Sequence, residues 1–492
     1  MLYHLRKSLT ATSIVLAMLL AHGQPAAAQT IAEAIQAAQR IPALRSANIG
    51  FYAINLTQEK VLYGHRESTS LIPASTLKLV TTATALEVLG PDFRCETHLQ
   101  YSGTVDDQGV LQGNIYIRGG GDPALGSLRF KHQYYKPYFI HTWVKAIQGL
   151  GIRKVAGAIV GDAQVYTDNT ALGTWILNDM GKHYGTVVSG LSIFDNIFTA
   201  KFRPTAPGQL ATLHAIIPSL PADLQLTHQV EIDDKIRYPW LHASGYPYIL
   251  ARHIQGQIPH KPSISHVKVS MPDPAYWAAT TLHTALQQQG IEIEQPATTL
   301  RRGHTAATVR HHLHTLHSPQ LQALIRVTNH DSINRYAEHL IKQLSLAQTG
   351  TGSTPQGIKL LKKFWRQQGI DTTGMLLYDG SGLSRYNAVT PRQLVQVLSY
   401  MYRSQYYAVF YDSLPIGGKT GSVAPFFRQA PLLKGRLKVK LGRLDKCKAF
   451  AGYTTNMAGD DIAFALLVNH YDGTDVVDAA MEEILTALVQ QE

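Results

Sequence analysis

Apolar residues recur at three- and four-residue spacing along SLIPASTLKLVTTATALEVLG, residues 70–90. This spacing places them on one face of a helix, and the Gly90-Pro91 pair is typical of a helix end. The residues before Ser75 are turn-like, so the pattern predicts that the helix begins close to that serine. The apolar positions that share the face are Leu79, Ala83, Leu86 and Leu89.

Three further stretches have a clear period. RVTNHDSINRYAEHLIKQL, residues 326–344, predicts a helix that starts near Ser332 and buries Tyr336, Ala337 and Leu340. AGYTTNMAGDDIAFALLVNHY, residues 451–471, predicts two strands joined by a hairpin at Gly-Asp-Asp. SISHVKVSM, residues 263–271, alternates as a single strand does.

The middle of the chain has a different pattern of residues. Between residues 96 and 300, short strand-like runs such as GVLQGNIYIRG and KVAGAIVGDA alternate with Gly and Pro. This pattern predicts one or two β-rich domains inserted into a larger α+β fold. A chain of 492 residues exceeds one ordinary core, so two or three domains are expected.

The first 28 residues have the organisation of an export signal: a basic start, an apolar run and small residues at Ala26 and Ala28. An uncleaved membrane anchor is the alternative, but the run is shorter than the roughly 20 apolar residues that a span needs. We therefore expect an exported protein of the periplasm or cell envelope, with no membrane span after cleavage. Loss of Arg6 and Lys7 lowers the formal net charge from +11 to +9. A basic exported protein suits an anionic envelope polymer and makes nucleic acid a poor candidate partner.

Three features carry little chemistry. Cys95 and Cys447 are the two cysteines, and without a disulfide framework we interpret them as separate small apolar residues, with pairing as the alternative. Four histidines lie close together in RHHLHTLH, residues 310–317, without a His-Glu-x-x-His pattern, so no metal site is expected. Gly119–Asp122 lacks a following Gly-Lys-Ser/Thr, which favours a tight turn over a phosphate site.

Ser75 and Lys78 are three residues apart, so one helical turn places them on the same face. A neutral lysine can take the proton of a serine hydroxyl, and burial together with the positive helix N-terminus disfavours the charged ammonium. The alternative is that Ser75 caps the helix. A second Ser-x-x-Lys, at Ser265 and Lys268, lies in a strand pattern that would point the two side chains to opposite faces.

The segment around Ser75 resembles the first active-site block of class C penicillin-binding proteins, the D-alanyl-D-alanine carboxypeptidases and endopeptidases of the bacterial envelope. Residues 117–127, 179–196 and 378–398 resemble the same family, and the blocks keep the family's order. The resemblance implies a penicillin-recognising serine transferase fold, α+β, with a discontinuous catalytic domain at residues 29–95 and 301–492 and β-rich insertions at 96–300. It also implies that Ser75 is the nucleophile and Lys78 its base.

The family's second element, Ser-x-Asn, matches Ser332 and Asn334. The resemblance implies that Ser332 relays a proton to the leaving amine and that Asn334 binds the substrate backbone. Ile333 stands where the family has Asp, and a helix cap by Asp331 or Ser332 is the alternative interpretation. The competing match Ser46-Ala47-Asn48 leads into a strand pattern instead.

The third element is Lys-Thr-Gly, and the chain contains that tripeptide at Lys419. In the family, however, the element lies on a strand shortly before Ala-Gly-Tyr, and this spacing selects Lys440, followed by Leu441 and Gly442. Leu441 cannot donate the hydrogen bond of a threonine. We therefore expect Arg443 to bind the substrate carboxylate in its place, although Arg443 as a solvated residue is the alternative. By family analogy, the backbone N–H groups of Ser75 and Arg443 form the oxyanion hole.

These observations predict a serine DD-peptidase that acts on peptidoglycan stem peptides, is acylated by beta-lactams and needs no metal or cofactor. A catalytically degenerate peptidoglycan-binding relative is the alternative, because Leu441 and Ile333 depart from the family. A beta-lactamase fits the long insertion less well. The sequence leaves open the preference between carboxypeptidase and endopeptidase activity, the oligomeric state and the role of the inserted domains.

Overall fold

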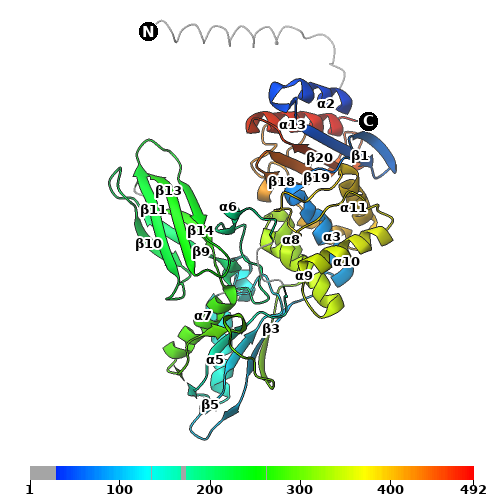
Figure 1. The fold of residues 1–492 in the computed structure, drawn as a ribbon. Helices are drawn as coiled ribbons and strands as arrows, with labels where there is room; N and C mark the ends of the chain where they lie inside the picture. Colours follow the sequence, from blue (N-terminus) through cyan, green and yellow to red (C-terminus); the bar gives the residue numbers. More distant parts are fainter. Residues whose placement is uncertain (1–28, 135, 168–172, 262, 492) are drawn as a thin grey trace.

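The computed structural model describes residues 29–491 except 135, 168–172 and 262. The expected export signal, residues 1–28, lies outside the described residues. Two regions lie side by side in Figure 1: one contains both ends of the described chain, and the other is built from its middle. We call them the catalytic region and the inserted region.

The catalytic region is a five-stranded antiparallel sheet covered by helices on both faces (Figure 1). The strand order is β18-β19-β20-β1-β2, which places β18 at one edge. The strands are β18 (Lys438–Leu444), β19 (Cys447–Thr455), β20 (Asp461–Asn469), β1 (Asn48–Asn55) and β2 (Lys60–His65). The helices are α2 (Ile31–Arg40), α3 (Leu77–Leu89), α8 (Leu321–His330), α9 (Asn334–Thr349), α10 (Thr354–Gln367), α11 (Pro391–Arg403), α12 (Tyr407–Ser413) and α13 (Thr474–Val489).

Strand alternation explains why the two faces of this sheet differ. On β20, the larger residues Phe464 and Leu466 pack against α2 and α13, whereas Ala463 and Ala465 face the helices on the other side. Burying each large side chain contributes about 1.5–3 kcal/mol, and the small residues let the helices approach closely. The sheet with its hairpin at residues 456–460 confirms the predicted strand pair.

The inserted region contains the remaining sheets of the described residues and two long helices, α5 and α7. One part has the sheet orders β16-β8-β6-β3-β17 and β15-β7-β5-β4, and the other has β10-β9-β14 and β11-β13-β12. Their bounds are β3 (Glu96–Tyr101), β4 (Thr104–Val105), β5 (Val110–Gln112), β6 (Ile115–Arg118), β7 (Lys154–Val155), β8 (Ile159–Asp162), β9 (Ile197–Arg203), β10 (Thr212–Ile217), β11 (Gln225–Asp233), β12 (Trp240–Ser244), β13 (Ala251–Pro259), β14 (Ser265–Ser270), β15 (Glu292–Ile293), β16 (Thr298–Thr299), β17 (His311–His317), α4 (Lys131–Tyr134), α5 (Lys136–Gly149), α6 (Leu177–Met180) and α7 (Pro274–Gln288).

The strand β17 joins a sheet that its position in the sequence does not suggest. It pairs antiparallel with β3, so the sheet of the inserted region extends to His317, beyond residue 300, where we expected the catalytic part to resume. The alternating histidines of β17 predict a strand but do not specify its partner. The division into domains stays a prediction apart from these pairings.

Both cysteines are buried and free, which favours the interpretation of Cys95 and Cys447 as separate apolar residues. The stretch Gly119–Asp122 is not the expected tight turn: it is an irregular segment whose Gly119 and Gly121 N–H groups donate to the carbonyls of Asp162 and Gly190. Among the described residues, no helix is both long and apolar enough to cross a membrane.

Candidate active site

Ser75 lies in a short 3₁₀ turn, η2 (Ala74–Thr76), that leads directly into α3. Ala74 has a left-handed backbone, with φ of 46°. The two glycines that face this turn have no room for a side chain: a Cβ on Gly382 would lie 1.8 Å from the carbonyl oxygen of Ala74, and one on Gly442 would lie 2.4 Å from that of Pro73. The turn is therefore enclosed by backbone on two sides, and Ser75 is half-buried at its apex.

Lys78 points from α3 toward Ser75, and its side chain is fully buried. Its Nζ donates to Ser75 Oγ at 2.8 Å, to Asn334 Oδ1 at 2.7 Å and to the Ser381 carbonyl at 2.7 Å. The capping alternative for Ser75 is not observed, because no side chain caps α3. The predicted proximity of hydroxyl and amine is confirmed.

Burial lowers the pKa of Lys78 to about 7, and the nearby carboxylates of Asp379 and Glu338 partly oppose this shift. Removing an ammonium from water disfavours its charged form, which is the physical cause of the shift. At neutral pH a large fraction of Lys78 is therefore an uncharged amine with two N–H groups and one lone pair. Of its three partners only the Ser75 hydroxyl carries a proton, so in this form Lys78 accepts from Ser75 and donates to Asn334 and Ser381. A group poised in this way can act as a general base toward Ser75.

The loop of residues 378–384 supplies the carbonyl of Ser381, and two buried carboxylates shape this loop. Asp379 accepts from the backbone N–H groups of Gly382 and Ser384 and from the indole N–H of Trp175. Glu338, on α9, accepts from the N–H of Ser381 at 2.7 Å, and burial raises its pKa to about 8. This loop, which belongs to the family-like block 378–398, thus supplies one of the three hydrogen-bond acceptors of Lys78.

Ser332 and Asn334 lie at the start of α9 and line the same cleft as Ser75. Ser332 has a left-handed backbone, with φ of 61°, and its Oγ accepts from Lys440 Nζ at 2.8 Å. Asn334 Nδ2 donates to the Tyr184 carbonyl at 3.0 Å, which fixes Oδ1 toward Lys78. No side chain caps α9, so the capping alternative is not observed here either.

Lys440 and Gly442 lie on β18 and face the site, as strand alternation predicts. Lys440 is fully buried, and burial together with the positive charge of Lys78 moves its pKa well below the ordinary value. Leu441 packs in the opposite core with Val439 and Phe450. Lys419 is exposed on a turn beside the start of β18, and the structure brings Lys440, and not Lys419, to Ser332.

A cleft of about 700 Å³ opens over these groups. Arg443 is exposed at the end of β18 and lines this cleft together with Ser75, Ser332 and Asn334. Among the described residues, its guanidinium makes no hydrogen bond or ion pair. A positive group without a partner in a cleft is available to an anionic ligand.

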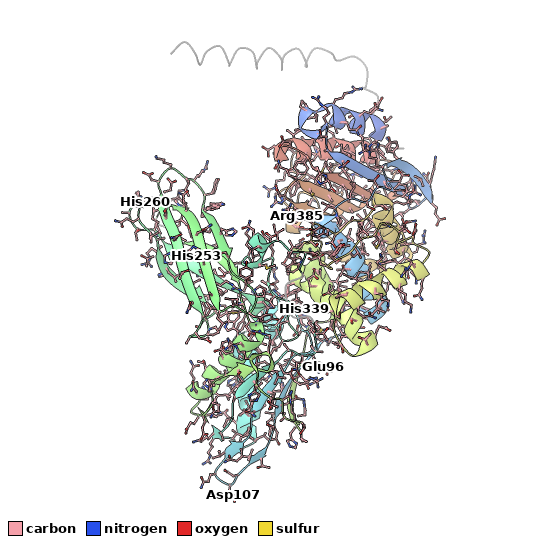
Figure 2. The ribbon with its side chains drawn as sticks, viewed as in Figure 1. Glu96, Asp107, His253, His260, His339 and Arg385 are labelled. Carbon is pink, nitrogen blue, oxygen red and sulfur yellow. The ribbon has the colours of Figure 1, made fainter. Side chains whose placement is uncertain are left out.

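Sequence reasoning did not identify the wall of the cleft that the inserted region forms. Asp179, Lys182 and Tyr184 lie there, and Arg385 lines the catalytic side, where Figure 2 labels it. The signal was present, because these residues fall within the family-like blocks 179–196 and 378–398, to which no role was assigned. Within the described ranges, no cluster of three metal-ligating side chains is found.

The sequence matches the model of the D-Ala-D-Ala carboxypeptidase 3 (S13) family over residues 28–490. It is 26% identical over 445 residues to D-alanyl-D-alanine carboxypeptidase DacB of Haemophilus influenzae, covering 89% of this chain and 88% of the relative. It is 25% identical over 474 residues to the D-alanyl-D-alanine carboxypeptidase of an Actinomadura species, covering 90% and 81%.

The fold is similar to that of a solved structure, penicillin binding protein 4 from Haemophilus influenzae. The TM-score is 0.78 at 24% sequence identity, with 94% of this chain and 98% of the other covered. A second crystal structure of that protein, complexed with a beta-lactam, matches with a TM-score of 0.73 at 23% identity, covering 93% and 98%. The predicted fold class, α+β of the penicillin-recognising type, is confirmed.

Proposed function

Because this chain belongs to the D-Ala-D-Ala carboxypeptidase 3 (S13) family of serine-type peptidases, we propose that it is an exported DD-peptidase that cleaves peptidoglycan stem peptides through an acyl-enzyme. The substrate bonds are D-Ala-D-Ala termini or the D-alanyl cross-links between stems. One observation carries the proposal: the buried amine of Lys78 lies 2.8 Å from the hydroxyl of Ser75.

In the first step, neutral Lys78 takes the proton of Ser75 as Oγ attacks the carbonyl of the penultimate D-alanine. The backbone N–H groups of Ser75 and Arg443 donate hydrogen bonds to the carbonyl oxygen and stabilise the negative charge that develops on it. Gly442 supports this role, since its missing side chain lets β18 approach the Ser75 turn closely. The tetrahedral intermediate then collapses to an ester on Ser75.

The leaving amine needs a proton for the C–N bond to break. Ser332 is suited to relay to it the proton that Lys78 took from Ser75, because its hydroxyl lines the same cleft as Ser75 and lies within hydrogen-bonding distance of the Lys440 amine. The relay returns Lys78 to its uncharged form. Asn334, held by both Lys78 and the Tyr184 carbonyl, presents a fixed amide to the substrate backbone. Water then hydrolyses the ester, with Lys78 again as base.

Arg443 recognises the terminal carboxylate of the substrate. A guanidinium can form two parallel hydrogen bonds to a carboxylate, and that of Arg443 is exposed in the cleft and unpaired among the described residues. Lys440 adds a buried positive charge on the same strand whenever it is protonated. Beta-lactams, which present a strained amide next to a carboxylate, would acylate Ser75 in the same place.

The alternative of a degenerate binding protein rests on Leu441 and Ile333. The structure gives each a packing role: Leu441 lies in the core beneath the sheet, and Ile333 packs at the edge of the inserted region's core. Neither side chain reaches Lys78 or Ser75. The geometry therefore favours an active enzyme.

The test is release of D-alanine from a pentapeptide that ends in D-Ala-D-Ala. Wild-type protein should release one equivalent of D-alanine per peptide, and the Ser75→Ala variant should release none. If wild-type protein binds the pentapeptide but releases no D-alanine, the binding-protein alternative replaces the enzyme.

A further inference from the structure

The inserted region holds the Ser332–Asn334 segment at three successive places. Three residues within or next to this segment each contact a group that belongs to residues 96–317. These contacts are Asp331 with Arg129, Asn334 with the carbonyl of Tyr184, and Arg335 with Asp195. The second element of the site is therefore positioned by a part of the chain that carries none of its three motifs.

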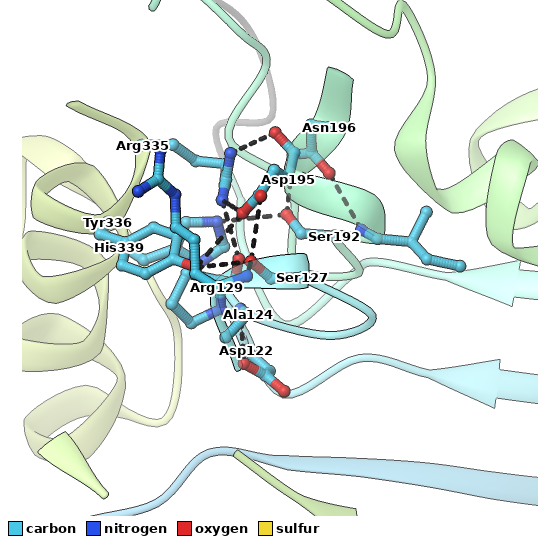
Figure 3. Close-up of polar contacts among 12 residues, drawn as sticks. Asp122, Ala124, Ser127, Arg129, Ser192, Asp195, Asn196, Arg335, Tyr336 and His339 are labelled. Carbon is cyan, nitrogen blue, oxygen red and sulfur yellow. Dashed lines mark hydrogen bonds and ion pairs between the residues drawn. The ribbon is translucent and has the colours of Figure 1, made fainter. Parts of the chain in front are cut away.

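Asp195 is the most heavily bonded of these groups (Figure 3). Its carboxylate pairs with Arg335, whose side chain is 3% exposed, and accepts from Tyr336 Oη at 3.2 Å and from Ser127 Oγ at 3.0 Å. Arg335 also donates to the backbone carbonyls of Asp195 and Pro123. Because a buried guanidinium needs a paired carboxylate, Asp195 fixes the position of Arg335.

The turn that carries Asp195 is itself unusual. Phe194, Asp195 and Asn196 all have left-handed backbones, with φ of 51°, 59° and 50°. Asp and Asn tolerate this region, whereas Phe rarely adopts it, so surrounding contacts must hold the turn. The side chain of Asn196 provides such contacts by donating to the Val187 carbonyl and to Ser192 Oγ.

The contacts continue along one face of α9. His339 and Gln343 follow Arg335 at four-residue spacing, and they bond the carbonyls of Gly121 and Gly120 at 2.8 Å each. Burial lowers the pKa of His339 to about 3, so this histidine is neutral and its contacts do not change near neutral pH. Figure 2 shows His339 where the two regions meet.

The start of α9 lacks the local feature that normally fixes a helix terminus. Its N-cap residue, Ile333, has no side chain that can bond the free N–H groups, and Ser332 just before it has a left-handed backbone. The placement of Ser332 and Asn334 therefore depends on tertiary contacts. Arg129, Tyr184 and Asp195 provide them from the inserted region.

We propose that Arg129 and Asp195 are positioning residues of the peptidase site, through which the inserted region sets the geometry of Ser332 and Asn334. The proposal rests on the proposed function, since the geometry matters for attack by Ser75. It makes the insertion part of the catalytic apparatus. A small displacement of Asn334 would loosen both its bond to Lys78 and its hold on the substrate.

The experiment measures acylation by a fluorescent penicillin, separated into the dissociation constant of the initial complex and the rate constant of acylation. Asp195→Asn keeps the left-handed backbone accessible, and it removes the charge and replaces one of the two acceptor oxygens with a donor. We expect it to lower the rate constant roughly 10- to 100-fold, the scale reported for misplaced groups, with little change in the dissociation constant. Arg129→Gln should have the same effect at smaller size, and Arg129→Lys should restore most of the rate.

Asp162→Asn is the matched control. Asp162 forms a similarly buried pair with Arg310 at 2.7 Å inside the inserted region, and it bonds no residue of 331–335. This variant should lower the melting temperature without lowering the acylation rate constant. If Asp162→Asn and Asp195→Asn lower the rate equally, the effect is one of stability and the proposal is wrong.

A double variant tests whether Asp195 acts through Asn334. In an Asn334→Ala background, Asp195→Asn should change the rate constant by less than about twofold, because coupled residues are not additive. A full independent effect would overturn the proposal. Amide hydrogen exchange of residues 331–338 should rise in Asp195→Asn and not in Asp162→Asn, and this readout needs no activity. Failure of the wild-type protein to form an adduct would reject the proposed function alone, and unchanged exchange would reject the positioning role alone.

Discussion

Two buried lysines each form a hydrogen bond to a serine of the site, Lys78 to Ser75 and Lys440 to Ser332, and the surroundings of the two lysines differ. Lys78 on α3 has three acceptors and two carboxylates nearby, whereas Lys440 on β18 bonds Ser332 Oγ and the Leu441 carbonyl, and the charge that shifts its pKa is Lys78. The α3 region keeps the family pattern, and the β18 region departs from it at Leu441 and Arg443.

The difference between α3 and β18 shows which positions of a motif can change while the active-site geometry is kept. On β18 the residues that face Ser75, Lys440 and Gly442, are those that the family has, and Leu441 faces the core. The departure should therefore alter recognition of the substrate carboxylate more than acylation. Three experiments test this comparison, in order of expected effect, and a fourth concerns the two cysteines.

Replacing Lys78 should have the largest effect. Lys78→Ala removes the base, so acylation by a fluorescent penicillin should slow by roughly 10²–10⁴-fold, the usual contribution of a general base. Circular dichroism of the variant checks that the fold persists. Acylation of a folded variant at the wild-type rate would mean that another group takes the proton of Ser75.

The second experiment compares the lysines of the two candidate third elements. Lys440→Ala should slow acylation by roughly 10²-fold or more, because it removes the hydrogen-bond partner of Ser332. Lys419→Ala should leave acylation unchanged, because that side chain is exposed and Lys440 is the lysine that bonds Ser332. If Lys419→Ala slows acylation and Lys440→Ala does not, Lys419 is the lysine of the third element.

The third experiment sharpens the proposed role of Arg443. Arg443→Ala should weaken capture of a free-carboxylate substrate roughly 10- to 100-fold, as expected for loss of a charged hydrogen-bond pair. Capture of the corresponding amide should change much less. Lys446→Ala, which removes another basic side chain of the cleft, is the control. Equal losses for acid and amide would show that Arg443 does not read the carboxylate.

The smallest effect concerns the cysteines. Because Cys95 and Cys447 are free and buried, a reducing agent should leave both the melting temperature and the acylation rate unchanged. A clear fall in melting temperature under reducing conditions would reveal a disulfide between them.

Local spacing predicted much of the site. One helical turn brings Ser75 and Lys78 together. The family's spacing before Ala-Gly-Tyr selected Lys440, and this spacing is preserved because a tight turn joins the paired strands β18 and β19. In each case the relevant distance is set by regular secondary structure over a few residues. Ser332 and Asn334 were selected by the family resemblance, and the helix that follows them distinguished this match from the one at Ser46 and Asn48.

The remaining parts depend on contacts that local sequence does not encode. The carbonyls of Tyr184 and Ser381, which bond Asn334 and Lys78, belong to the backbone and have no residue signature. The pairing of Asp195 with Arg335 joins residues 140 positions apart, and the partner of β17 is chosen by the sheet. Strand alternation indicated which face Lys440 takes, but it could not show that Leu441 fills a core.

The proposed mechanism depends most on an uncharged Lys78 that takes the proton of Ser75, and the pH dependence of acylation tests this role of Lys78 directly. A protonated ammonium has no lone pair, so the rate constant for penicillin adducts mapped to Ser75 should rise about tenfold per pH unit below pH 7 and level off above it, following the pKa of about 7. A midpoint near the ordinary lysine value of about 10.5, or a rate that does not change with pH, would contradict the account.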